Sequence, residues 1–281
     1  MLARLRGWVK RQVRGRLRLA MAGRGRPFTS ADLLSALRGL GIASGDVLLV
    51  HSSFDQFARF TGKPSDVLAV LQTAVGPSGT LMLPTLPFLG RAVEYVRELR
   101  VFDVKRTPSQ MGLLTELFRR MPSVIRSVHP THPVALWGAA AGEMAAGHAD
   151  AATPCGVGTP YVRLLERNGK ILFLGCDIDV MTFFHAVEEL LEPRMPFSPF
   201  TRRTYELESR DAEGRVRVTR TRLFEPVHGR RRLAKLLPVL KQRGAWREGR
   251  VGALKIRLVG ARDVLSACEA LAGKGVYCYD G

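Results

Sequence analysis

Short apolar segments alternate with amphipathic helical segments between residues 30 and 191, and this alternation constrains the fold more than any other feature of the sequence. The apolar segments are bounded by Gly, Pro or polar turns, which is typical of buried strands. They lie at residues 46–51, 80–85, 133–138 and 170–175. Helices are predicted at residues 30–40, 64–76, 109–121, 159–169 and 180–190. Strands that alternate with helices favour an α/β fold in which helices cover both faces of a mostly parallel central sheet.

The ends of two helices carry their own signals. Thr29 and Asp32 have the spacing of a capping box at the start of the first helix. Pro64 and Gly76 stand where the second helix should begin and end. These signals support the assignment of the flanking apolar segments as strands.

The sequence changes character after Pro193. Residues 202–225 alternate on either side of a turn at 211–214, which predicts an antiparallel hairpin. A basic helical segment interrupted by Pro238, a further strand at 252–260 and a closing helix at 261–273 follow. We therefore predict one domain over residues 27–281, in which a basic elaboration at about 200–250 extends the sheet or caps it.

Polar side chains gather where the predicted strands end. His51, Ser52 and Ser53 follow the first strand, and Thr85 ends the second. Asp177 and Thr182 follow the strand at 170–175. Ligands of open α/β sheets bind beyond the carboxyl ends of the strands, so we expect these residues to share one site.

His185 and Glu188 are three residues apart in the apolar helical segment VMTFFHAVEEL, residues 180–190. Side chains at this spacing lie on one helix face and can touch. A catalytic pair fits this arrangement, and so does a buried histidine whose hydrogen bond is satisfied by a neighbour. Taken alone, the pair fits the second interpretation better; its position after an apolar strand, together with the motif pattern described below, favours catalysis.

The formal net charge of +18 is concentrated in two segments. Residues 1–26 hold nine Arg or Lys and no acid, and residues 202–257 hold seventeen against six acids. The first segment has the spacing of a basic amphipathic helix, an arm that can lie on an anionic membrane surface or pack on the domain. Nucleic acid is a weaker alternative because no recognition motif accompanies the charge.

Several other classes of protein are disfavoured. No apolar run reaches the length of a membrane-spanning helix, and the amino terminus lacks the pattern of a secretory signal. The four cysteines have no paired spacing, which favours reduced thiols and no metal. We expect a cytoplasmic protein, with peripheral contact to the inner membrane face if the arm binds lipid.

Five motifs together carry a resemblance to a known family. They are HSS at 51–53, FDVKRTPSQMG at 102–112, RSVHPTHPVALWG at 126–138, TPCGVGTPYVRL at 153–164 and the His185/Glu188 pair. In this order they resemble the aminoglycoside 3-N-acetyltransferase family, over residues 30 to 270 or so. The resemblance implies the antibiotic N-acetyltransferase fold and transfer of an acetyl group from acetyl-CoA to an amine of an aminoglycoside or related amino sugar.

The residue chemistry suits that reaction. An amine attacks a thioester only as the free base, and a neutral imidazole can take its proton near neutral pH. A carboxylate on the other imidazole nitrogen fixes the tautomer and stabilises the imidazolium. We predict His185 as the general base and Glu188 as the residue that orients it.

The resemblance also implies a set of residues along the bound CoA. They are His51, Ser52, Ser53, Thr85, Ser109, Met111, Arg126, Ser127 and His129. Turn amides, hydroxyls and Arg126 can bind phosphate oxygens, whereas His51 and His129 fit a structural role equally well. His132 is predicted to be structural. Asp177, Thr182, Glu189 and Glu192 are expected to bind the acceptor.

The charge distribution leaves the acceptor open. Aminoglycosides are polycations, and a basic segment near the site would repel them, so a nucleotide-linked or lipid-linked amino sugar is the alternative acceptor. A metal-dependent hydrolase that uses His129, His132, His185 and Asp177 lacks a supporting metal motif. A non-enzymatic membrane or nucleic-acid binding protein would depend on the two basic segments alone.

Overall fold

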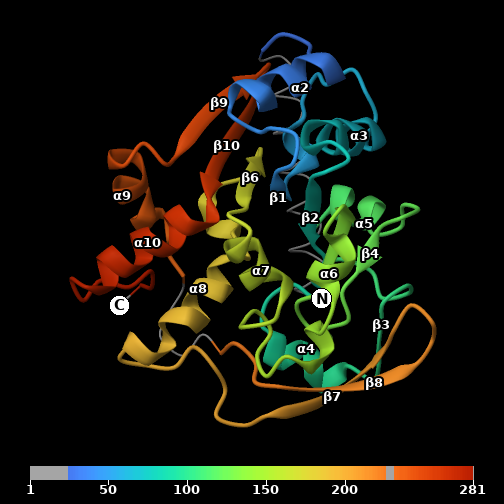
Figure 1. Cartoon of the computed structure of the whole chain (residues 1–281), viewed down its shortest axis with the longest axis vertical. Coiled ribbons are helices and arrows are strands. Elements are labelled where there is room, and N and C mark those ends of the chain that lie inside the picture. Colours follow the sequence, from blue (N-terminus) through green and yellow to red (C-terminus); the bar gives the residue numbers. More distant parts are fainter. Residues whose placement is uncertain (1–24, 226–230, 281) are drawn as a thin grey trace, which may run out of the picture.

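A computed structural model describes residues 25–225 and 231–280 of the chain. A seven-stranded sheet forms its centre (Figure 1). The strands of this sheet are β1 Val47–Ser52, β2 Thr80–Pro84, β4 Ile125–Arg126, β5 Val134–Gly138, β6 Lys170–Leu174, β9 Arg247–Val251 and β10 Leu254–Gly260. Their order across the sheet is β4-β5-β2-β1-β6-β10-β9. The predicted basic amphipathic arm, residues 1–26, lies almost wholly outside the described residues and stays a prediction.

The predicted α/β class with a mostly parallel sheet is confirmed. The three central strands β2, β1 and β6 are parallel. β5 and β10 each run antiparallel to both of their neighbours. Five of the seven strands therefore point the same way, with the two reversed strands near the edges.

The reversal of β5 determines where the site forms. Because β5 is antiparallel to β2, the residues before β5 lie at the same edge of the sheet as the carboxyl ends of β1, β2 and β6. The amide and hydroxyl of Thr85 both donate to the Pro133 carbonyl, at 2.9 and 3.0 Å. The histidine-rich segment 129–132 is brought to this edge only by that strand direction.

Helices cover both faces of the sheet, as predicted. They are α2 Ser30–Gly39, α3 Pro64–Val75, α4 Ala92–Glu98, α5 Leu113–Phe118, α6 Ala141–Ala145, α7 Pro160–Glu166, α8 Phe184–Leu191, α9 Leu237–Gln242 and α10 Ala261–Ala272. Successive residues of a strand face opposite sides of a sheet, so a doubly covered strand is apolar throughout. Leu48 and Val50 accordingly pack in the core under α2 and α3, while Leu49 packs in the core under α7, α8 and α10.

A second, three-stranded sheet lies beside the large one (Figure 1). It consists of β3 Phe102–Asp103, β7 Tyr205–Arg210 and β8 Val216–Thr221. β7 and β8 pair antiparallel at the position of the expected hairpin. The hairpin is not part of the large sheet; Leu207 packs with α4 through Val93 and Val96. Within the described residues, no helix has the length and apolarity needed to span a membrane.

Candidate active site

His185 and Glu188 meet on one face of α8. The His185 Nδ1 lies 2.9 Å from the Glu188 Oε2, as the spacing predicts. The histidine side chain is 18% exposed and the glutamate side chain 1% exposed. His185 Nε2 makes no hydrogen bond to another described residue, so it is the nitrogen available to a substrate. Thr182, one turn earlier, accepts the His185 backbone amide at 3.1 Å.

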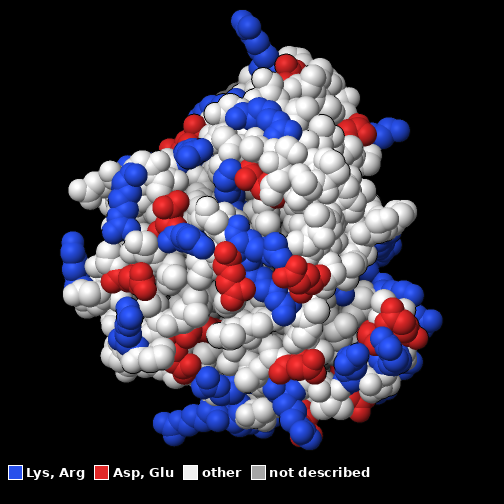
Figure 2. All heavy atoms as spheres, in the orientation of Figure 1, with Lys and Arg blue, Asp and Glu red and all other residues white. Residues whose placement is uncertain are grey.

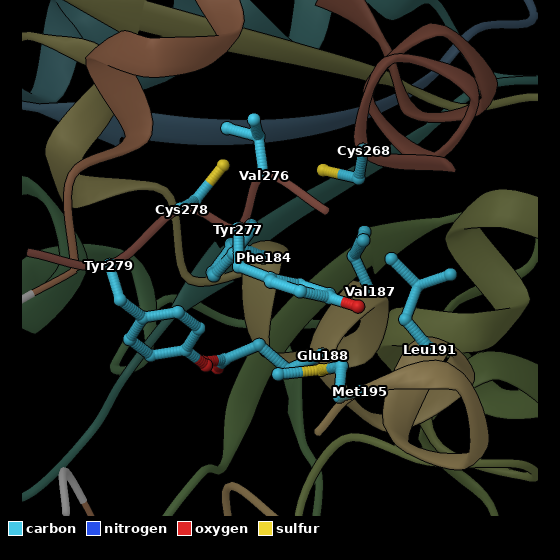
Figure 3. Close-up of a pocket in the computed structure, with 10 residues that line it drawn as sticks. All are labelled: Phe184, Val187, Glu188, Leu191, Met195, Cys268, Val276, Tyr277, Cys278 and Tyr279. Carbon is cyan, nitrogen blue, oxygen red and sulfur yellow. The ribbon is translucent and has the colours of Figure 1, made fainter. Parts of the chain in front are cut away.

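The second oxygen of Glu188 binds two residues from the last part of the chain. Arg231 Nε donates to Oε1 at 2.8 Å, and the Tyr279 hydroxyl donates to the same oxygen. Figure 3 shows the carboxylate next to the Tyr279 hydroxyl, at the side of a cavity of about 20 Å³ whose other walls are mainly apolar. Burial opposes ionisation of Glu188, but its hydrogen bond with His185 and the charge of Arg231 hold its pKa below the ordinary value. Glu188 is therefore a carboxylate.

Aromatic rings enclose the His185 imidazole. The Phe224 ring centroid lies 4.2 Å from the imidazole centroid, and the His132 imidazole lies 5.2 Å away, edge to face. Burial and the charge of Arg231 lower the His185 pKa, against the opposing effect of Glu188. The net shift is downward, so His185 is a neutral base at near-neutral pH. His132 was predicted to be purely structural, and its ring forms part of this wall.

A cleft of about 490 Å³ opens at the carboxyl edge of the sheet, and we call it the β1–α5 cleft. The predicted site residues that line it are His51, Ser52, Ser53, Met111 and Thr182. They come from the end of β1, the turn before α5 and the segment that enters α8. The structure thus brings together residues that are 131 positions apart in the sequence, from His51 to Thr182.

Cys176 also lines the β1–α5 cleft. Burial raises the pKa of its thiol to about 12, so the sulfur stays protonated near neutral pH. A protonated thiol is a poor nucleophile. Direct attack of an amine on a bound thioester is therefore better supported by this site than an acylated cysteine.

Arg126, expected along the bound CoA, is buried and turned toward other residues of the protein. The guanidinium donates to Thr85 Oγ1, to the Thr85 carbonyl, and to the Val104 and Thr107 carbonyls, at 2.6 to 3.1 Å. It also lies over the Phe102 ring, 4.8 Å from the centroid. Arg126 does not line the cleft; it fastens the loop after β3 to the end of β2.

Four other residues expected along CoA are also turned inward. Ser109 bonds to Thr115, and Thr85 is held by Pro133 and Arg126. Ser127 bonds to His148 and accepts the Val134 amide, while His129 Nδ1 accepts the amides of Thr131 and His132. All four side chains are buried and support the walls of the cleft from behind. His51 lines the cleft at its floor, stacked on Phe173 at 5.5 Å, and burial lowers its pKa to about 3.

The three acids predicted to bind the acceptor do not form one open group. Thr153 Oγ1 and the Cys155 amide donate to Glu189, and burial raises the pKa of this carboxyl to about 8. Glu192 pairs with Arg222 at 3.2 Å. Asp177 pairs with Arg257 at 3.0 Å. Each of the three acids already has a partner within the protein, and Asp177 is the most exposed of them.

The histidines of the alternative metal site lie near one another, with ring centroids 6.3 Å apart for His129 and His132 and 5.2 Å apart for His132 and His185. Over residues 25–225 and 231–280, no three His, Cys, Asp or Glu side chains are placed to hold a metal ion. His129 instead stacks on His148, with ring centroids 4.6 Å apart. Asp177 pairs with Arg257.

Sequence reasoning missed Arg231 and Tyr279 as parts of the site. They follow Glu188 by 43 and 91 positions. Arg231 stands in a run of three arginines, and nothing in that run marks one of them as buried. Only the tertiary fold identifies these two residues.

Comparison with known proteins confirms the resemblance drawn from the motifs. Residues 49–272 match the family described as Aminoglycoside 3-N-acetyltransferase. Aminoglycoside N(3)-acetyltransferase IX of Micromonospora chalcea is 32% identical over 183 residues, which are 60% of this chain and 65% of that protein. Aminoglycoside N(3)-acetyltransferase IV of a Salmonella species is 29% identical over 249 residues, 87% of each protein.

A solved structure shows the same fold. AAC-IIIb in its binary complex with CoASH superposes with a TM-score of 0.75 at 24% identity, and the match covers 91% of this chain and 100% of that one. The M. chalcea alignment spans just under two thirds of that relative, whereas the other two matches span most of both chains.

Proposed function

The chain belongs to the aminoglycoside 3-N-acetyltransferase family, a family of acyltransferases, and from this we propose that it transfers an acetyl group from acetyl-CoA to an amine of a saccharide. One observation carries the proposal: a neutral imidazole, held by a buried carboxylate, stands one helical turn from a residue that lines a large cleft. His185 acts as the general base, and Glu188 is its positioning residue.

The reaction balances with these groups alone. The acceptor amine attacks the thioester carbonyl, so that a C–N bond forms and the C–S bond of acetyl-CoA breaks. His185 Nε2 takes the proton from the attacking nitrogen, and the departing thiolate of CoA then takes up a proton. Glu188 accepts from Nδ1 throughout, which fixes the tautomer that leaves Nε2 free and stabilises the imidazolium formed during attack.

We place acetyl-CoA in the β1–α5 cleft. His51, Ser52, Ser53, Met111 and Thr182 line it, and hydroxyls and turn amides of this kind can bind pantetheine and phosphate oxygens. The solved structure of AAC-IIIb, which has the same fold, is a binary complex with CoASH. Thr85, Ser109, Arg126, Ser127 and His129 support this cleft indirectly.

We propose that the acceptor binds on the solvent side of the His185 imidazole. The names of the relatives make an aminoglycoside or related amino sugar one candidate. A phosphorylated amino sugar is the second, because the acids expected to bind a polycation are already paired.

Thiol release from acetyl-CoA tests the reaction. We expect turnover with at least one acceptor in a panel of aminoglycosides and free or phosphorylated amino sugars. His185→Ala should lower kcat by about 100-fold to 10,000-fold, the usual contribution of a general base. Thermal melting and CoA titration calorimetry serve as controls that the variant folds and binds the donor. Equal turnover by native protein and variant would remove His185 from the mechanism.

A further inference from the structure

We propose that the acceptor amine is carried by a saccharide with one or more phosphate groups, which bind in an arginine-lined groove next to the catalytic pair. This inference rests on the proposed acetyl transfer and specifies its acceptor. The groove, which we call the arginine groove, has a volume of about 790 Å³. Its charged lining residues are Arg91, Arg97, Arg202, Arg203, Glu94 and Glu225.

The groove lining has a surplus of positive charge. Both of its acids are near Arg91, with Glu94 at 3.8 Å and Glu225 at 3.9 Å. Arg97 and Arg202 form no ion pair or hydrogen bond through their side chains within the described parts of the chain. Arg203 lies over the Tyr205 ring, 4.0 Å from its centroid, which leaves its guanidinium edge open. Three arginines are thus available to an anion. Figure 2 shows Lys and Arg side chains along the lower border of this face, near the loop that leads into β7.

Aromatic contacts connect the groove to the general base. Phe200 lines the groove and stacks on Phe224, with ring centroids 4.8 Å apart. Phe224 in turn lies 4.2 Å from the His185 imidazole. The groove therefore begins within two ring contacts of the base.

The chemistry of the lining selects phosphate over ammonium. Guanidinium groups bind phosphate oxygens in pairs of parallel hydrogen bonds, and several of them around one groove raise the local concentration of anions. The same positive charges would repel a polycationic drug. Glu189, Glu192 and Asp177 offset this repulsion only in part, because each already has a partner within the protein. Nucleotide-linked and lipid-linked amino sugars share the phosphate chemistry that the groove fits.

Binding of inorganic pyrophosphate gives a test that does not depend on turnover. Native protein saturated with CoA should bind pyrophosphate in titration calorimetry, and Arg97→Gln/Arg202→Gln should bind it at least tenfold more weakly. Both arginines are exposed, so this variant should fold. The matched control is Arg250→Gln/Lys255→Gln, which removes the same charge from the exposed surface of β9 and β10 and should bind as native protein does. No binding by native protein, or equal binding by the groove variant, would overturn the inference.

Acetyl transfer supplies the second test. Glucosamine, glucosamine 1-phosphate, UDP-glucosamine, glucosamine linked to farnesyl diphosphate in detergent, and kanamycin A form the acceptor panel. We expect a kcat/KM at least tenfold higher for a phosphorylated acceptor than for glucosamine, with the advantage lost through KM in the groove variant. The nucleotide and lipid members show which source the groove prefers. A higher kcat/KM for kanamycin A than for every phosphorylated acceptor would refute the inference. Absence of His185-dependent thiol release from the whole panel would instead refute the proposed function. Pyrophosphate binding would then still test whether the groove binds phosphate groups.

Discussion

Glu188 receives hydrogen bonds from His185, Arg231 and Tyr279 although its side chain is almost fully buried. A buried carboxylate is costly unless it is paired and its oxygens accept donors. Here the arginine neutralises the charge, and the tyrosine and histidine complete the hydrogen bonds. The arrangement fixes the position of the imidazole before substrate binds, which is the state a general base requires.

The pH dependence of catalysis should reflect this pairing. Because the His185 pKa is lowered, the neutral base persists below pH 6.5, and the acid limb of kcat/KM should have its midpoint below that value. Glu188→Gln removes the carboxylate that raises the His185 pKa, so the limb should move to still lower pH. The same change should reduce kcat roughly 10-fold to 1,000-fold, since the imidazolium loses its counter-charge.

Fixed-time assays of thiol release from pH 4.5 to 9, with one acceptor, would measure both effects. Use of the same acceptor for native protein and variant cancels the titration of the acceptor amine. A native midpoint above pH 6.5, or an unchanged midpoint in Glu188→Gln, would contradict this assignment.

Cys176 offers a simple check on direct transfer. Its thiol lines the β1–α5 cleft but has a pKa of about 12, so it is not expected to form a thioester with the acetyl group. Cys176→Ser should keep kcat within about fivefold of the native value, because no covalent step is lost. Intact-mass spectrometry after mixing with acetyl-CoA alone should show no acetylated protein; an acetyl adduct that disappears in the variant would reverse this conclusion.

Glu189 should make the stability of the fold pH-dependent. Its pKa rises from an ordinary 4.5 to about 8 on folding, because burial outweighs the hydrogen bonds from Thr153 and Cys155. The folded protein therefore holds this proton more tightly than the unfolded chain, so the stabilisation is complete below pH 4.5 and is lost as the pH rises through about 8. At about 1.4 kcal/mol per pKa unit, the loss at high pH is at most roughly 5 kcal/mol.

Glu189→Gln keeps the shape of the side chain and removes the titration. We expect its melting temperature to exceed that of native protein at pH 9 and to approach it at pH 5. Scanning calorimetry across this range measures the difference. A constant difference between the two proteins at all pH values would exclude Glu189 as the titrating group.

At the scale of elements, the direction of β5 could not be predicted from the sequence. Apolar alternation predicted the segment 133–138 but carries no information on which way a strand runs. β9 was missed because Arg247, Glu248 and Arg250 give this edge strand no apolar pattern. α5 begins at Leu113 instead of residue 109, since Gly112 adopts a φ of 110° that breaks the helix.

The candidate site likewise contains residues that the sequence predicts and residues that it does not. His185 and Glu188 were predictable because local helix geometry sets their contact. His51, Ser52, Ser53 and Thr182 were expected at the carboxyl edge, and they line the cleft there. The inward orientation of Arg126 depends on loop carbonyls brought by 19 to 41 positions of intervening chain, which no local pattern encodes.

Arg126 should stabilise the contact between the loop after β3 and the end of β2. Arg126→Gln leaves the Val104, Thr107 and Thr85 carbonyls short of donors in a buried region, so we expect a loss of about 2 to 4 kcal/mol in the free energy of unfolding. The KM for acetyl-CoA should rise, because the fastened loop leads to Met111 in the cleft wall. Urea denaturation and donor kinetics measure the two effects. The exposed Arg106→Gln on the same loop is the control; native stability in Arg126→Gln would show that the clamp is dispensable.

At the scale of the whole molecule, part of the positive charge of the late segment is neutralised in ion pairs. Arg231, Arg222 and Arg257, all in the basic late segment, each contact an acid near the site. The arginine groove is one place where cations of this segment and of α4 gather with incomplete pairing. In the proposed function, the location of the unpaired cations, and not the net charge alone, selects the acceptor.

His185 stands between the β1–α5 cleft, reached through Thr182, and the arginine groove, reached through Phe224 and Phe200. With acetyl-CoA in the cleft and the acceptor in the groove, as proposed, both reactants can occupy the protein simultaneously, so catalysis should proceed through a ternary complex. Initial-velocity measurements at several fixed acetyl-CoA concentrations should then give double-reciprocal lines that intersect, and labelled CoA should not exchange into acetyl-CoA until the acceptor is added. Parallel lines would mean that the two compartments are occupied in turn.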